Sequence, residues 1–149
     1  MIKWSCKLLS FISVINWIIK TFCKKVREKY SDKIIIAGNV STKQGVHDLL
    51  ECGVDIVKVG IGGGSACTTR IQTGIGMPQF SCALKCSDAK KDNTYIISDG
   101  GITCPGDMAK SFGVGADFVM IGGEFAGHYE NPGEIIEENG VKYKFFYGM

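Results

Sequence analysis

The chain has 149 residues, 45% of them hydrophobic and 21% charged, which is enough apolar material for the core of one ordinary domain. Its 17 basic and 15 acidic residues leave a formal charge of +2, a balance that gives no support to binding of nucleic acid or of an acidic membrane surface. Seven cysteines lack C-x-x-C and zinc-type spacing, which favours a reducing cytoplasm and packing roles for all of them except Cys67.

The first 23 residues form an apolar segment to which the sequence assigns no role. Residues 8–19 are apolar all round, a run too short to span a bilayer comfortably, and no small-residue cleavage site follows them. A buried helix is the favoured interpretation, with a membrane anchor as the alternative. We therefore expect two parts, residues 1–23 and a domain of residues 24–149, the second beginning with the polar end of a helix.

Four apolar runs separated by helical patterns indicate the fold class. Strands that are apolar throughout are typical of parallel sheets whose two faces are both covered. Four consecutive strand–helix units predict an α/β fold with a parallel sheet. The expected strands are 33–38, 55–59, 94–98 and 116–121.

Three helices are expected between these strands. Ser41 lies three residues before Gln44, a capping-box spacing, and Gly53 is suited to end that helix. Pro78 and Pro105 can each open a helix. We expect inward faces made by Phe80, Ala83 and Leu84 in the first of these and by Met108, Ala109 and Phe112 in the second.

Residues 134–145 differ from the rest of the chain. Polar and apolar residues alternate there around Asn139-Gly140, the strongest short signal for a β-hairpin. The sequence therefore predicts a two-stranded flap near the C-terminus, projecting over a site.

Glycine-rich turns follow the carboxyl ends of the expected strands. In parallel α/β folds, and above all in (β/α)₈ barrels, that edge carries the active site. Glycines can also serve only tight strand–helix turns, but several in series favour a ligand site. The turns are Gly38-Asn39, Gly60-Ile61-Gly62, Asp99-Gly100-Gly101 and Gly122-Gly123.

Cys67 is the candidate nucleophile, because a thiolate attacks an electron-poor carbon well and leaves again easily. Thr69, two residues on, could hand a proton to a leaving group. A lone cysteine in a loop is more often inert than catalytic; the glycines around Cys67 favour the catalytic interpretation.

Two other turns suit the remaining parts of a nucleotide. The carboxylate of Asp99 could accept from two vicinal sugar hydroxyls, although a capping role is an equal alternative for an isolated aspartate. Gly122-Gly123, before a short apparent helix at 124–127, suits a phosphate. Tyr147 could reach the same phosphate through its hydroxyl.

Six stretches of the chain together resemble the GMP reductase family. They are 35–40 (IIAGNV), 58–70 (KVGIGGGSACTTR), 96–101 (IISDGG), 104–107 (CPGD), 118–123 (FVMIGG) and 146–149 (FYGM). Inosine-monophosphate dehydrogenase shares the fold and the cysteine, but its loop usually lacks the Cys-Thr-Thr-Arg run. The resemblance extends from about residue 24 to the end of the chain.

The resemblance implies NADPH-dependent reductive deamination of GMP to IMP and ammonia. Cys67 would attack purine C2, and Thr69 would assist the departure of ammonia. Asp99 would hold the ribose, other residues would surround the phosphate, and the last two residues would approach the base. The implied substrate-binding set is Ser65, Asp99, Gly100, Gly101, Gly122, Gly123, Tyr147, Gly148 and Met149.

The resemblance also implies a monovalent cation, typically K⁺, held by main-chain carbonyls of the cysteine loop. The carbonyls are those of Gly62, Gly64, Cys67 and Arg70, while Gly63 stands where the family usually has proline. The implied partners are GMP and further copies of the chain, as a homotetramer in the cytoplasm, without nucleic acid or membrane.

The length indicates how much of the family's fold is present. A complete barrel takes about 250 residues, so four strand–helix units predict a partial (β/α)₈ TIM barrel corresponding to the second half. We expect the chain alone to bind GMP poorly and to turn over little. The alternatives are an inosine-monophosphate dehydrogenase-like enzyme, or a non-catalytic nucleotide-binding or assembly fragment.

Overall fold

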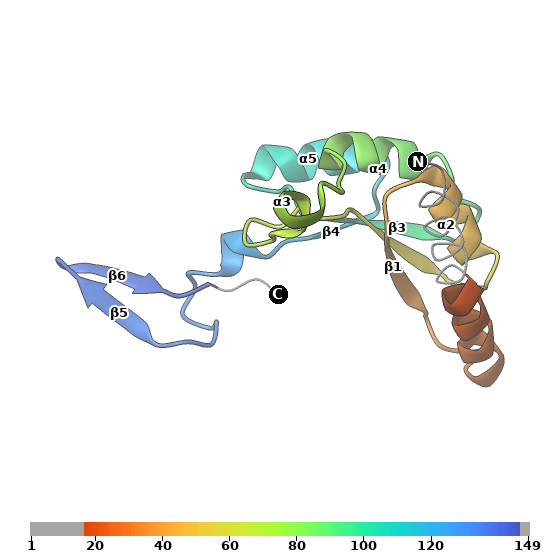
Figure 1. Cartoon of the computed structure of the whole chain (residues 1–149), viewed down its shortest axis with the longest axis horizontal. Helices are drawn as coiled ribbons and strands as arrows, with labels where there is room; N and C mark the ends of the chain where they lie inside the picture. The colour runs from red at the N-terminus through yellow and green to blue at the C-terminus, as the bar shows by residue number, and fades with distance from the viewer. Residues whose placement is uncertain (1–16, 147–149) are drawn as a thin grey trace, which may run out of the picture.

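A computed structural model describes residues 17–146, and its centre is a four-stranded parallel sheet. The strands lie side by side in chain order (Figure 1): β1 (Ile36–Val40), β2 (Ile56–Val59), β3 (Tyr95–Asp99) and β4 (Phe118–Met120). The predicted α/β fold with a parallel sheet is confirmed. β1 begins at Ile36 rather than Lys33, because the Ile35 N–H donates to the Asp55 carboxylate (2.7 Å) instead of to a neighbouring strand.

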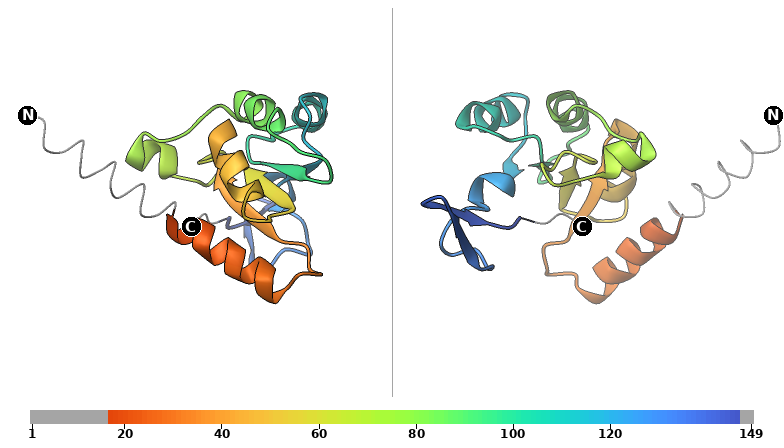
Figure 2. Two further views of the ribbon diagram at one scale, coloured as in Figure 1. Left: turned by 90° about the vertical axis from the view of Figure 1, so that its right-hand side faces the viewer. Right: turned by 60° about the vertical axis from the view of Figure 1, so that its left-hand side comes forward.

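Helices cover one face of this sheet. They are α2 (Lys43–Leu50), α4 (Gln79–Ser87) and α5 (Pro105–Gly113), and α4 and α5 lie together on the same side of β3 and β4 (Figures 1 and 2). The helix of residues 17–29 packs on α2, where Lys20 pairs with Asp48 (2.6 Å). The core lies between sheet and helices and includes Val46, Leu49, Val57, Val59, Cys82, Cys86 and Ile96.

The helix details differ from the sequence predictions in three places. Thr42, rather than Ser41, caps α2, since its hydroxyl accepts from Gly45 N (3.1 Å). The inward face of α4 is formed by Gln79, Cys82, Ala83 and Cys86, while Phe80 and Leu84 point outward. The small side chains on the inward face of α4 let this helix approach the sheet closely, which Phe80 and Leu84 in their place would prevent.

Helix α5 is also rotated from the predicted orientation. Ser111 is its buried residue and Met108 is half-buried, whereas Ala109 and Phe112 are exposed. The Ser111 hydroxyl lies 3.5 Å from the buried Ser98 hydroxyl of β3. A polar contact across the helix–sheet interface therefore takes the place that the apolar pattern assigned to Phe112.

The other face of the sheet carries no helix among residues 17–146. Alternate strand residues point to it, including Ile36 (54% exposed), Tyr95, Phe118 (48% exposed) and Met120. Tyr95 and Phe118 pack edge to face with centroids 6.1 Å apart. Within the described part of the chain β1 and β4 have open outer edges. This arrangement is that of a partial barrel, whose inner face would be this apolar one.

The C-terminal hairpin is confirmed as β5 (Ile135–Glu138) and β6 (Val141–Lys144). Asn139 and Gly140 have φ angles of +53° and +78°, as a type I′ turn requires. Instead of covering the sheet, the hairpin extends away from it (Figure 1). Lys144 Nζ fixes its base by donating to three carbonyls, those of His128, Tyr129 and Asn131, at 2.7–3.1 Å.

Part of the N-terminal segment lies outside the described residues, namely 1–16, as does 147–149 at the other end. The helix of residues 17–29 runs through the expected boundary at residue 23, and the division of the chain there stays a prediction. No helix within residues 17–146 is long and apolar enough to cross a membrane.

Candidate active site

A cavity of about 500 Å³ lies at the carboxyl ends of β2, β3 and β4. It brings together two of the four predicted glycine turns, Asp99-Gly100-Gly101 and Gly122-Gly123, with Cys67 and the residues that follow the Gly60-Ile61-Gly62 turn. Phe146, just after β6, reaches it, but no residue of β5 or β6 lines it. The lining residues include Gly63, Gly64, Ser65, Cys67, Asp99, Gly100, Gly101, Thr103, Gly122, Gly123 and Phe146.

Cys67 lies in the loop between β2 and α3 (Thr69–Thr73), a short helix that the sequence patterns did not predict. Its N–H donates to Gly64 O (3.1 Å), which closes a turn. Its sulfur lies 3.3 Å from the Thr69 hydroxyl. That hydroxyl, the Thr69 N–H and the nearby Arg70 charge all stabilise a thiolate, and they hold the pKa of Cys67 below its ordinary value. A more nucleophilic sulfur results.

The Arg70 side chain ties this loop together. It donates from Nε to Ile61 O (3.2 Å) and from Nη2 to Met77 O (2.5 Å), so it spans both flanks of the loop. A Cβ atom on Gly62 would lie 2.7 Å from Arg70 Cγ, so the clamp leaves no space for a side chain there. The sequence analysis assigned Arg70 only a carbonyl ligand and missed this role.

The four carbonyls expected to hold a cation are partly engaged already. Gly64 O accepts from Cys67 N, and Arg70 O accepts from Gly74 N (3.1 Å). Each carbonyl oxygen has a second lone pair, so these hydrogen bonds do not exhaust the acceptor capacity of the set. Among residues 17–146 no cluster of histidine, cysteine and carboxylate side chains could bind a metal ion.

The Asp99 turn is interlocked with the Cys67 loop. Gly101 N donates to Gly63 O (2.8 Å). A Cβ atom on Gly60 would lie 2.4 Å from Asp99 O, and one on Gly100 would lie 2.7 Å from Gly63 C. Gly60 and Gly100 also have positive φ angles, +126° and +92°, which side chains disfavour. These glycines are therefore required for the close approach of the two turns.

The residues expected around a phosphate come together on the other side of the cavity. A Cβ atom on Gly123 would lie only 2.7 Å from Ser65 Oγ, so the serine hydroxyl sits directly against this turn. The following helix is a single 3₁₀ turn, η1 (Gly123–Phe125), rather than a helix at 124–127. A single 3₁₀ turn has only a small dipole. An anion bound here would therefore be held by hydrogen bonds from the backbone N–H groups and from Ser65.

Asp99 has two side-chain partners that the sequence analysis missed. Its Oδ2 accepts from Asn39 Nδ2 (2.8 Å) and lies 2.9 Å from Lys58 Nζ. Asn39 Nδ2 also donates to Gly60 O (2.7 Å) and so links the ends of β1, β2 and β3. Asn39 was noted in its turn without a role. Lys58 gave no signal, because its neighbours are apolar and its partner lies on the next strand.

Gln79 lies beneath the loop and was also missed. It is buried at the start of α4 and donates to Val59 O and Ser98 Oγ, both at 3.0 Å. These bonds join the helix to the ends of β2 and β3. Its Oε1 is buried without a hydrogen-bond partner in the described structure. In the sequence, a glutamine after Pro78 looks like an ordinary surface residue of a helix. Its burial and its contacts become clear only from the packing of α4 on the sheet.

The remaining site predictions have different outcomes. Tyr147, Gly148 and Met149 lie outside the described residues, as does Cys6. Cys104 is exposed at the start of α5, so its predicted packing role is wrong: the extended backbone before Pro105 turns it to solvent. The predicted packing role is confirmed for Cys23, Cys52, Cys82 and Cys86, all of which are buried.

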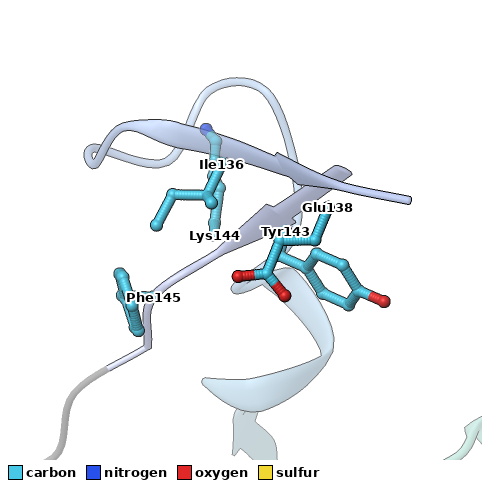
Figure 3. Close-up of a pocket in the computed structure, with 5 residues that line it drawn as sticks. All are labelled: Ile136, Glu138, Tyr143, Lys144 and Phe145. Atoms are coloured by element: carbon cyan, nitrogen blue, oxygen red, sulfur yellow. The ribbon is translucent and has the colours of Figure 1, made fainter. Parts of the chain in front are cut away.

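Another hollow, of about 270 Å³, lies on the hairpin (Figure 3), and Cys67 is not among its lining residues. Its side chains come from the two strands and the residue after them, and none of them is a good nucleophile. They are Ile136, Glu138, Tyr143, Lys144 and Phe145. The chemistry of the cavity at Cys67 has no counterpart in this hollow.

Comparison with sequence families and curated proteins gives a consistent result. Residues 14–149 match the model of the IMP dehydrogenase / GMP reductase domain, so the match begins inside the apolar segment and earlier than the expected residue 24. "GMP reductase 2" of Bos taurus and of Homo sapiens are each 57% identical over 129 residues. "GMP reductase" of Buchnera aphidicola subsp. Schizaphis graminum is 59% identical over 130 residues. The chain spans about 37% of the length of these relatives.

A solved structure shares the fold. The crystal structure of GMP reductase C318A from Trypanosoma brucei superposes with a TM-score of 0.79 at 35% identity. The alignment covers 87% of this chain and 29% of that chain. The parallel sheet and helices described above are therefore a part of that larger fold.

Proposed function

Since the chain belongs to the IMP dehydrogenase / GMP reductase family, we propose that it carries the nucleophile and the GMP-binding part of a GMP reductase. The observation that carries this proposal is the position of Cys67. Its activated sulfur lines the same cavity as Asp99 and as the Ser65–Gly123 contact. A nucleophile, a sugar-binding carboxylate and a phosphate-binding turn thus face one space of nucleotide size.

The reaction that fits this arrangement replaces an amino group by hydrogen. The thiolate of Cys67 forms a bond to C2 of the purine, and the bond from C2 to the amino nitrogen breaks. Thr69, 3.3 Å from the sulfur, delivers a proton to the departing ammonia. NADPH, when bound, supplies the hydride that takes the place of sulfur on C2, and sulfur leaves with its electron pair as thiolate. The described residues assign no site to this cofactor.

The remaining residues bind and orient the substrate. Asp99 accepts from the ribose hydroxyls, and Ser65 with the backbone of Gly122 and Gly123 holds the phosphate. Gly100 and Gly101 form the wall between these two parts. A K⁺ ion would order the cysteine loop through its free carbonyl lone pairs. Assembly into a homotetramer and a cytoplasmic location belong to the same proposal.

The test is protection of Cys67 from alkylation by GMP. Among the described residues Cys104 is exposed and Cys67 is half-buried, while the other four cysteines are buried, so iodoacetamide followed by mass spectrometry reports on Cys67 and Cys104. We expect millimolar GMP to slow modification of Cys67 and to leave Cys104 unaffected. Asp99→Asn should raise the GMP concentration needed for this protection. Equal modification of Cys67 with and without GMP would contradict the proposal.

Turnover distinguishes an enzyme from a binding module. NADPH oxidation on addition of GMP is expected to be slow in the isolated chain, because four parallel strands are present of a barrel's eight. Cys67→Ala should abolish this rate and preserve nucleotide binding. Unchanged turnover in Cys67→Ala would show that Cys67 is not the nucleophile. GMP binding by the unsubstituted chain without any turnover would favour the non-catalytic binding module.

A further inference from the structure

Lys58 is placed behind Asp99 and outside the cavity. It lies in the middle of β2, where its register partners are Gly38 on β1 and Ile97 on β3. Its side chain extends along the helix-free face toward the carboxyl ends of the strands, where Nζ lies 2.9 Å from Asp99 Oδ2. Lys58 is not among the residues that line the cavity. Nζ also lies 3.6 Å from Sδ of Met120, a lining residue without charge. The charge of Lys58 therefore acts on a ligand through Asp99.

The contacts of Asp99 are divided unequally between its two oxygens. Both of its side-chain partners, Lys58 and Asn39, bind Oδ2. Two donors occupy the two lone pairs of that oxygen. Among residues 17–146 Oδ1 has no partner, so it is the oxygen that remains for a ligand. Two fixed donors also leave the carboxylate a single orientation.

The charge of Lys58 has a second consequence for the cavity. Of the described residues that line it, Asp99 alone is charged. An uncompensated carboxylate would repel a phosphate-bearing ligand. Lys58 cancels this charge at hydrogen-bond distance and is only 28% exposed, so solvent screens the pair incompletely. A neutral donor in its place could orient Asp99 but could not cancel its charge.

We propose that Lys58 is a positioning residue that fixes Asp99 with Oδ1 toward the cavity and so makes the site select ribonucleotides over 2′-deoxyribonucleotides. This inference rests on the proposed binding of GMP. Oδ1 has two lone pairs, and in the fixed orientation both vicinal hydroxyls of a ribose can donate to it. A 2′-deoxyribose fills only one of these positions and leaves the other lone pair unpaired.

The experiment compares GMP with 2′-deoxy-GMP in Lys58→Met, a variant of similar length without charge. The readout is the nucleotide concentration that halves the alkylation rate of Cys67, measured at about 0.15 M salt to screen the phosphate from the carboxylate. We expect this concentration to rise about tenfold for GMP and about twofold or less for 2′-deoxy-GMP. Lys58→Arg, which keeps the charge and donors, should largely restore the preference for GMP.

Lys90→Met is the matched control. Lys90 and Asp117 form an ion pair of similar length (3.0 Å) and exposure, but their strand end lies opposite the cavity. This variant should leave both nucleotide concentrations unchanged. An equal loss for GMP and 2′-deoxy-GMP in Lys58→Met, or no loss for either, would overturn the proposal that Lys58 positions Asp99 to select ribonucleotides. Failure of GMP to protect the unsubstituted chain would instead overturn the proposed function, and this inference with it.

Discussion

At the scale of single residues, the reactivity of Cys67 is set by its close neighbours in the sequence. The Thr69 hydroxyl makes the largest contribution to lowering the pKa of Cys67, followed by the Thr69 N–H and then by the charge of Arg70. Burial of the thiol acts in the opposite direction. All of these groups belong to the first turn of α3 or its start. The loop thus activates its own nucleophile without a histidine base.

Substitution of Thr69 should change this activation in a known direction. In Thr69→Val the hydroxyl is lost while the backbone N–H remains, so the pKa of Cys67 should rise toward that of a free thiol. Alkylation rates measured against pH, in a Cys104→Ser background, should give a profile displaced to higher pH. Thr69→Ser keeps the hydroxyl and should keep the original profile. A profile unmoved by the valine would show that the hydroxyl does not stabilise the thiolate.

At the scale of elements, the same contact recurs where β2 and β4 begin. Asp55 accepts from Ile35 N and pairs with Arg27, and Asp117 accepts from Ile96 N (2.8 Å) and pairs with Lys90 (3.0 Å). Each aspartate follows a left-handed glycine by two residues, Gly53 and Gly115. Each one ties the start of its strand to the strand before it.

Removal of one of these carboxylates should weaken the sheet measurably. Asp117→Ala leaves Ile96 N–H and Lys90 without their partner, so we expect a loss of about 1–3 kcal/mol in the free energy of unfolding. Asp117→Asn keeps an acceptor and should lose less. Asp32→Ala, which breaks the exposed pair with Lys33, should change stability by no more than about 0.5 kcal/mol. Urea unfolding followed by circular dichroism measures all three, and equal losses would contradict this account.

At the scale of the whole molecule, the sheet is covered on one face only. Helices bury Val57 and Val59 of β2, while Ile36, Tyr95 and Phe118 on the opposite face are exposed. Both outer edges of the parallel sheet are open within residues 17–146. An exposed apolar face with unpaired edges favours association with another chain.

We therefore expect the isolated chain to self-associate through this face. Sedimentation velocity at increasing concentration should show species larger than the monomer, and Phe118→Lys should shift the distribution toward the monomer. Phe112→Lys is a matched control, since Phe112 is similarly exposed (46%) but lies on the outer side of α5. A monomer at every concentration, or an equal effect of both substitutions, would contradict this expectation.

The order of strands and helices could be predicted from the sequence because glycines, prolines and apolar runs are local signals. The cavity could be predicted for the same reason, since Cys67 and Asp99 follow strands that end at one edge. Lys58, Asn39 and Gln79 could not be assigned their contacts, because their partners lie on other elements. The orientations of α4 and α5 were also missed, since buried cysteines and Ser111 took places that larger apolar residues were expected to fill.

The interlocked turns at the cavity also bear on how this site can change in evolution. Where Gly60 and Gly100 meet the backbone of the neighbouring turn, no added methyl group fits, so new specificity cannot arise there by single substitutions. Variation is left to the few lining positions that already carry side chains, such as Thr103 and Phe146. Substitutions that change ligand preference should therefore occur at these side-chain positions, while the glycines of the interlocked turns stay the same in descendant sequences.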